Sequence, residues 1–326
     1  MIESEKVQLF EKTPIPKAVA TLAAPVLLAF NAVNNLFGVG SSSMMSRAMG
    51  KKDYDTVERS SAFGFYSALF CGILLSLLYS VYHTPFLHIL GADTENIAVT
   101  GEYLKWTTAF GAAPAILNVV MAYLVRSEGF ALHASIGTIS GCLLNMILDP
   151  VFILPWGLDL GAAGAGLATC LSNCAACLYF FILLAVRRGK THVCVHPGRF
   201  KPTKAIVLGI CGVGIPAAIQ NLLNVTGMTV LNNFTSAYGS NAVAAMGIAQ
   251  KINMIPLYIA MGLGQGIMPL ISYNYSSGDT RRMKKTVTFS VAVSVGFLAV
   301  LTIGYYVFAN GLAPLYGLAY AQLTAE

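Results

Sequence analysis

The sequence predicts an all-α protein, a bundle of helices that crosses a membrane several times. Hydrophobic residues make up 56% of the chain and charged residues only 10%, with a mean hydropathy of +0.67. Soluble domains carry about 25% charged residues, so this chain cannot cover a water-facing surface. Its apolar runs have the length of membrane helices, rather than the ~10-residue alternating segments of an outer-membrane barrel. We therefore expect an integral membrane protein.

Eight apolar spans can be drawn along the chain. They cover residues 18–45, 60–82, 103–125, 131–152, 161–186, 205–234, 242–273 and 286–308. Each begins and ends at a polar or basic connection, and the Lys and Arg residues cluster in those connections. This clustering explains the net charge of +6 as a signal of membrane orientation, with the basic loops cytoplasmic, and not of nucleic-acid binding. The polar first 17 residues show no cleavable signal peptide.

The longest connection divides the chain into two predicted lobes. An N-terminal lobe covers residues 1–188, a basic cytoplasmic linker covers 189–204, and a C-terminal lobe covers 205–326. The linker contains Pro197-Gly198 and Pro202, which are typical of an irregular connection.

The sequence predicts that the two lobes are copies of one another. Asp53 corresponds to Asp279 at an offset of 226 residues, and Gly91 corresponds to Gly317 at the same offset. The match of Pro25 with Pro216 has an offset of only 191. The difference between the two offsets, about 35 residues, is the length of one helix with its loop, and we expect that this stretch is missing from the first copy. We expect that the first span joins two helices, and that the second copy is cut short after Gly317.

Asp149 is the one acidic residue that falls within an apolar span. An ionised side chain there costs several kcal/mol unless a cation, a proton or polar neighbours compensate it. Asn145 lies one turn earlier on the same face. Their oxygens suit a hard cation such as Na⁺ or a protonatable site, and no imidazole or sulfur ligand points to a transition metal. Alternatively, Asp149 next to Pro150 ends a helix near the water interface.

The order and spacing of several motifs resemble the multidrug and toxic compound extrusion (MATE) transporters over nearly the whole chain. The matching stretches include Asn34-Asn-Leu-Phe-Gly-Val-Gly40, Ser46-Arg-Ala-Met-Gly50-Lys-Lys-Asp53, Asn145-Met-Ile-Leu-Asp149-Pro, Gly161-Ala-Ala-Gly164-Ala-Gly166, Gly214-Ile-Pro216 and Gly262-Leu-Gly-Gln-Gly266. The resemblance implies twelve helices in two six-helix lobes, of which about eight remain here. It also implies export of bulky, mostly cationic organic compounds in exchange for Na⁺ or H⁺.

The resemblance also assigns a cation site in the first lobe. It matches Asn145 and Asp149, adds the hydroxyl of Thr169, and adds the amide of Asn118. A further carboxylate of the family's first helix falls in the inferred gap, so the chain departs from the family pattern there. Both residues also have a purely structural alternative to cation binding. The Thr169 hydroxyl can bond to the backbone of its own helix, and the Asn118 amide can link two helices.

Two groups of polar residues are candidates for the substrate pathway. One group is Gln220, Asn221 and Asn224, and the other is Gln250, Lys251 and Asn253. Lys251 lies about nine residues into its span, too deep for easy contact with water. The alternatives are that the amides bond to neighbouring helices and that Lys251 reaches the membrane surface.

The function predicted from these features is a secondary antiporter for small organic molecules in the plasma membrane, working as a monomer without a cofactor or a nucleic-acid partner. One alternative is a non-transporting fragment of such a transporter, and another is a lipid-linked oligosaccharide flippase of the same architecture. A membrane enzyme is not expected, because no Ser/His or His/Asp arrangement recurs in the spans. The Cys174-Ala-Ala-Cys177 spacing is read as small-residue packing.

Overall fold

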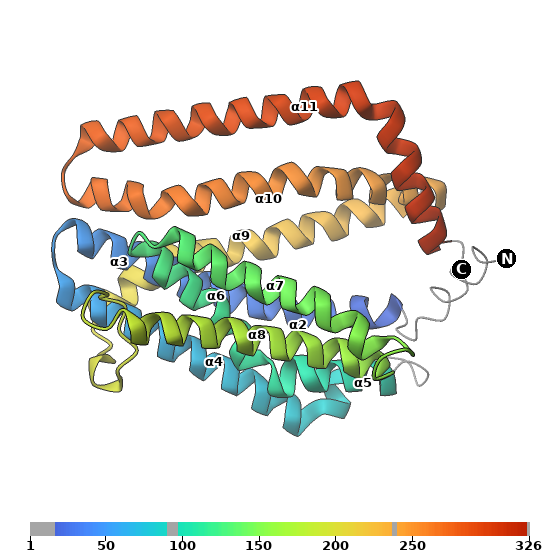
Figure 1. Ribbon diagram of the computed structural model, residues 1–326, viewed down its shortest axis with the longest axis horizontal. Coiled ribbons are helices and arrows are strands. Elements are labelled where there is room, and N and C mark those ends of the chain that lie inside the picture. The colour runs from blue at the N-terminus through green and yellow to red at the C-terminus, as the bar shows by residue number, and fades with distance from the viewer. Residues whose placement is uncertain (1–16, 90–96, 237–239, 325–326) are drawn as a thin grey trace. The chain divides into compact units, whose positions relative to one another are not determined.

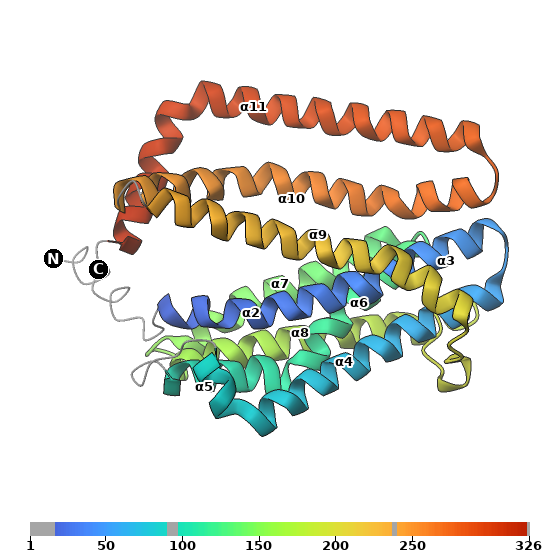
Figure 2. The same cartoon turned by 180° about the vertical axis from the view of Figure 1, so that it is seen from behind.

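The computed structural model describes residues 17–89, 97–236 and 240–324. The described residues form helices and no strand, which confirms the all-α prediction. In chain order the helices are α2 (Lys17–Val33), η1 (Asn34–Val39), α3 (Gly40–Gly50), α4 (Tyr54–Ile89), α5 (Ile97–Leu104), η2 (Lys105–Phe110), α6 (Ala112–Ser127), α7 (Ala131–Ile153), α8 (Gly161–Val186), η3 (Pro197–Arg199), α9 (Lys204–Ser236), α10 (Ser240–Ser276) and α11 (Thr280–Thr324) (Figures 1 and 2).

Within these described residues, seven helices are long and apolar enough to cross a membrane, and the bent pair made by 97–110 and α6 brings the number to eight. The chain is thus a multi-pass membrane protein. The first span runs without interruption through α2, η1 and α3, as a single π-containing helix. That it joins two helices of a longer pattern stays a prediction.

The third span, predicted for residues 103–125, is bent. It bends by 52° at the break between Phe110 and Ala112. A Cβ at Gly111 would lie 2.7 Å from the carbonyl oxygens of Trp106 and Thr107, so only glycine fits this bend. The π-helical η2 just before it and Pro114 just after it both weaken the regular hydrogen-bond ladder.

The chain divides into two compact units, Met1–Ile219 and Gln220–Glu326. This boundary lies inside α9, because the start of α9 packs on the first unit. Arg47 Nη2 donates to the carbonyl oxygen of Gly209 at 3.2 Å, and a Cβ at Gly40 would lie 2.5 Å from that of Ile210. The division into lobes at the linker 189–204 stays a prediction.

The core of the first unit is built by side chains of helices α2 to α8. Large side chains that are fully buried there include Met45, Leu104, Ile116, Met121, Leu124 and Phe180. Glycines bring the helices close: a Cβ at Gly164 would lie 2.5 Å from the carbonyl oxygen of Phe152, and one at Gly166 would lie 2.7 Å from that of Tyr103. In the second unit, α10 and α11 run antiparallel, and the Tyr305 hydroxyl donates to the carbonyl oxygen of Ile252 at 3.2 Å.

The turn that joins α3 to α4 recurs between α10 and α11, which supports the internal repeat. In the first turn the Asp53 N–H donates to the carbonyl oxygen of Ala48 at 3.0 Å, and in the second the Asp279 N–H donates to that of Asn274 at 3.1 Å. The left-handed residue is Lys52 (φ 59°) in the first and Gly278 (φ 78°) in the second. Each residue of the second turn lies 226 positions after its counterpart, the offset found in the sequence.

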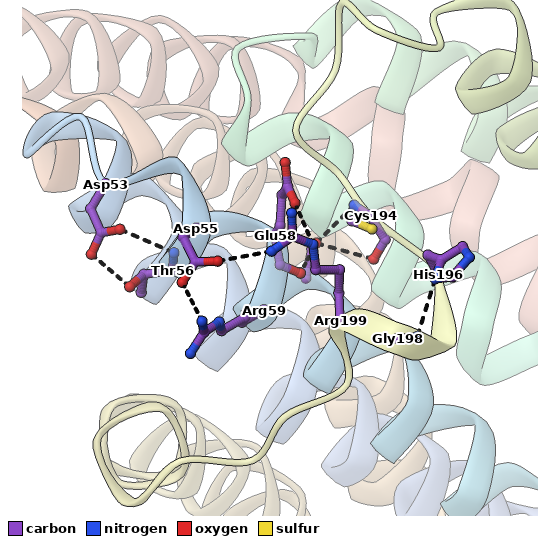
Figure 3. Close-up of polar contacts among 10 residues, drawn as sticks. Asp53, Asp55, Thr56, Glu58, Arg59, Cys194, His196, Gly198 and Arg199 are labelled. Carbon is purple, nitrogen blue, oxygen red and sulfur yellow. Dashed lines mark hydrogen bonds and ion pairs between the residues drawn. The ribbon is translucent and has the colours of Figure 1, made fainter.

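The predicted linker is fixed along the start of α4 (Figure 3). Arg199 donates to Asp55 Oδ1 at 2.9 Å and forms an ion pair with Glu58 Oε2 at 3.0 Å. Ser61 exchanges two hydrogen bonds with the backbone of Cys194, at 2.9 and 3.2 Å. Exposed ion pairs stabilise a protein by only about 0.2–1 kcal/mol each. The hydrogen bonds between Ser61 and the Cys194 backbone therefore contribute to the position of the linker alongside the ion pairs of Arg199.

Asp53 caps the first turn of α4 with two bonds (Figure 3). It accepts from the Thr56 hydroxyl at 2.6 Å and from the Thr56 N–H at 3.1 Å. These bonds, the hydroxyl first, hold the pKa of the Asp53 carboxyl below its usual value. Asp279 caps α11 with one bond, from the Arg282 N–H at 2.9 Å.

Asp53→Ala is expected to destabilise the first unit by about 1 kcal/mol at pH 7, the usual cost of a lost helix cap. Because the pKa is lowered on folding, the charge-dependent part of this contribution is present above the unfolded value of about 3.9 and is lost as the pH falls through the folded value. Melting temperatures of purified protein at pH 7 and pH 3 measure it. Asp279→Ala, which removes a single bond, is the matched control. An equal difference between wild type and Asp53→Ala at both pH values would contradict the prediction.

Candidate functional site

The candidate site lies where the last turns of α7 face the first half of α8. Asp149 does not end its helix, because α7 continues to Ile153. The following loop folds back over the helix end: the Leu158 N–H donates to the carbonyl oxygen of Val151, and that of Leu160 donates to Phe152, both at 2.8 Å. Asp149, about four residues before the end of α7, is half-buried.

Asn145 connects the carboxylate to α8. Its amide nitrogen donates to Asp149 Oδ1 at 3.2 Å and lies 3.5 Å from the hydroxyl oxygen of Thr169. The Thr169 hydroxyl in turn donates to the carbonyl oxygen of Ala165 at 2.9 Å. The Thr169 hydroxyl thus bonds its own helix while its oxygen faces Asn145, and its role in cation binding stays a prediction. The structure brings together three of the four predicted ion-site residues.

Asn118, the fourth, has a different partner. Its amide nitrogen donates to Asn173 Oδ1 at 3.2 Å, so it links α6 to α8. Asn118 is only 9% exposed, and its own amide oxygen has no hydrogen-bond partner among the described residues. Sequence reasoning missed Asn173, although it follows Thr169 by four residues and therefore lies on the same face of α8.

No cationic side chain neutralises the carboxylate within the described part of the chain. The four ion pairs found there involve Asp55, Glu58 and Glu102, and none involves Asp149. A half-buried carboxylate with a single neutral hydrogen-bond donor is incompletely compensated. The arrangement therefore offers oxygens and one negative charge to a small cation or a proton.

The six predicted pathway residues lie on α9 and α10 in the second unit. Gln220, Asn224 and Asn253 are exposed, and Asn221 is half-buried, as is Gln250. The backbone of Lys251 belongs to α10, but its side chain lies outside the described part of the structure. A role of these residues in a substrate pathway stays a prediction.

An aromatic pocket of about 550 Å³ opens elsewhere in the first unit, between η1, α4, the linker and α9. Five rings line it: Phe37, Phe63, Tyr66, Phe70 and Phe200. Phe63 and Phe200 stack with their centroids 6.0 Å apart. Its volume is in the range of small-molecule sites. The sequence did not predict it, because its walls come from four separate segments of the chain.

Comparison with known proteins gives concordant matches. The family model MatE matches residues 15–151 and 216–323. The multidrug export protein MepA of Staphylococcus aureus (strain MRSA252) is 36% identical over 294 residues, and that of Staphylococcus saprophyticus is 35% identical over 303 residues. These matches cover 88% and 90% of this chain but only 63% and 65% of the relatives.

Solved structures match the fold over 92% of the chain. An outward-facing multidrug resistance MATE family transporter has a TM-score of 0.85 at 25% identity, with 66% of that chain covered. A MOP superfamily transporter from Pyrococcus furiosus, for which a reversed polarity of the binding pocket suggests a different function, has a TM-score of 0.83 at 25% identity, also with 66% covered. The chain thus spans somewhat less than two thirds of the length of the two curated relatives.

Proposed function

The chain belongs to the multidrug and toxic compound extrusion (MATE) family, a family of transporters and not of enzymes, and from this premise we propose that it is a secondary antiporter. It exports bulky, mostly cationic organic compounds in exchange for Na⁺ or H⁺. It acts as a monomer in the plasma membrane, with its basic loops on the cytoplasmic side.

The observation that carries the proposal is the face shared by Asn145, Asp149 and Thr169. A carboxylate without a cationic side-chain partner is costly to ionise within a membrane helix. Binding of Na⁺ or of a proton removes that cost, and release restores it. The charge of the face thus differs between the loaded and the empty states, and such a difference can bias a two-state transporter.

Substrate properties follow from the relatives and from the pocket. The curated relatives are multidrug export proteins, and the aromatic pocket in the first unit offers rings to a planar organic cation. These features support small organic substrates as the exported class.

A second candidate is a non-transporting fragment, which the 63% and 65% coverage of the relatives favours. Such a chain keeps the first unit and its ion-site residues but does not move substrate across the bilayer.

Reconstitution of the 326-residue chain in lipid vesicles separates these candidates. A fluorescent lipophilic cation such as ethidium is placed outside, and a Na⁺ or proton gradient is imposed in either direction. For an antiporter we expect ethidium flux that follows the gradient and collapses when an ionophore dissipates it. Ethidium flux that depends on neither gradient contradicts antiport. Binding of Na⁺ without any ethidium flux indicates the non-transporting fragment.

A further inference from the structure

The aromatic pocket of the first unit offers rings but no charge to a ligand. Besides its five rings, the pocket is lined by Ser67, Cys71, Pro197 and Cys211. None of the side chains that line it in the described part of the chain carries a charge. Phe70, one of the five rings, is exposed, so a ligand has access. A charged compound therefore finds no counter-ion here, whereas a flat ring system finds partners for stacking.

Phe200 of the linker is held in position by two other rings of the pocket. It stacks nearly parallel to Phe63, at an interplanar angle of 5°, and meets Tyr66 edge to face with the centroids 5.6 Å apart. Aromatic pairs prefer centroid separations of about 4.5–7 Å. Phe200 is nevertheless 40% exposed, so its ring is available for a further stack with a bound ligand.

Polar contacts fix the linker beside Phe200. The Tyr66 hydroxyl donates to the carbonyl oxygen of Val195 at 2.7 Å, and the neighbouring Arg199 forms an ion pair with Glu58 at 3.0 Å (Figure 3). The wall that Phe200 provides is thus in place before a ligand arrives. A binding site that is ordered in advance loses less conformational freedom on binding.

We propose that this pocket binds flat aromatic compounds by stacking, whether or not they carry a charge, and that Phe200 determines this specificity. The pocket is separate from the ion site, since none of the described residues that line it belongs to α7 or α8. The inference extends the proposed function and rests on it in one respect, namely that these ligands are the exported compounds. Ligand binding itself requires neither Asp149 nor an ion gradient.

Ethidium binding to the purified chain tests the proposal. Ethidium is a flat cation whose fluorescence rises when it leaves water, so a titration gives its Kd. We expect saturable binding that acridine, which is flat and uncharged near neutral pH, displaces. Tetrabutylammonium, which carries the same charge as ethidium but has no ring, should displace none of it. Absence of saturable binding, or displacement by tetrabutylammonium as effective as that by acridine, would overturn the proposal.

Phe200→Ala is expected to raise the Kd for ethidium about tenfold, because one stacking partner is lost. Phe200→Tyr keeps the ring and should restore wild-type binding. Phe181→Ala is the matched control, since Phe181 is 39% exposed and its ring centroid lies 6.0 Å from that of Phe65, but it belongs to α8 and not to the pocket. We expect wild-type binding from this control. Equal losses in Phe200→Ala and Phe181→Ala, or no recovery in Phe200→Tyr, would show that Phe200 does not determine the specificity.

Asp149→Asn separates this inference from the proposed function. This variant should bind ethidium as the wild type does, although it no longer exports the dye. Loss of ethidium binding in Asp149→Asn would place the dye at the ion site and overturn the pocket, while antiport stands. Conversely, if Phe200→Ala weakens binding but the wild type shows no gradient-driven flux, the pocket stands and antiport fails.

Discussion

Asp149→Asn is expected to abolish gradient-driven export while leaving the protein folded. The substitution keeps the shape of the side chain and removes its charge, so the face that Asp149 shares with Asn145 and Thr169 loses its carboxylate. An interaction with a charged group stabilises by about 1.5–3 kcal/mol, which corresponds to a loss of roughly 10- to 100-fold in cation affinity. Flux of a fluorescent organic cation into vesicles under a Na⁺ or proton gradient measures the effect.

Asp159→Asn provides the matched control for this experiment. Asp159 lies ten residues further on, in the exposed loop between α7 and α8, and undergoes the same chemical change. Its φ of 51° is in the left-handed region, which asparagine tolerates as well as aspartate does. We expect wild-type flux from this variant. Undiminished flux in Asp149→Asn would remove the carboxylate from the mechanism.

Gly164→Ala is expected to cause a large loss of stability. The new Cβ would lie 2.5 Å from the carbonyl oxygen of Phe152, and this backbone atom cannot move aside as a flexible side chain can. The start of α8 must then shift away from the end of α7, which also separates Thr169 from Asn145. Overpacking of this kind costs about 1–3 kcal/mol. Thermal unfolding of the detergent-solubilised protein measures it, and ²²Na⁺ binding reports the damage to the site.

Gly212→Ala tests the same substitution where space is available. A Cβ at Gly212, within α9, would meet no atom within 4 Å. Because alanine is the better helix former by up to about 1 kcal/mol, we expect this variant to be as stable as the wild type or more so. Gly164→Ala should therefore lower the melting temperature, whereas Gly212→Ala should leave it unchanged or raise it. A loss of similar size in both would show that close packing at Gly164 is not the cause.

Hydropathy alone predicted the fold to a large extent. All eight predicted spans correspond to helices or to the bent helical pair, because an apolar segment in a bilayer must satisfy its backbone internally. The predicted ends of the spans were less accurate. α4 begins at Tyr54 and not at residue 60, since Asp53 caps a polar first turn that hydropathy does not mark as part of a span. The bend at Gly111 was missed, because it arises from contacts within the span.

The sequence by itself determined that this is a membrane-spanning MATE family chain with a carboxylate and an amide on one face of a helix, since helical periodicity fixes which side chains of one segment share a face. Only the tertiary structure decided which other segments meet that face. It joined Thr169 to Asn145 and paired Asn118 with Asn173, because the packing of α6, α7 and α8 sets which side chains come within hydrogen-bond distance. That packing depends on the fit of glycines such as Gly164 against neighbouring backbone, which no local pattern in the chain encodes.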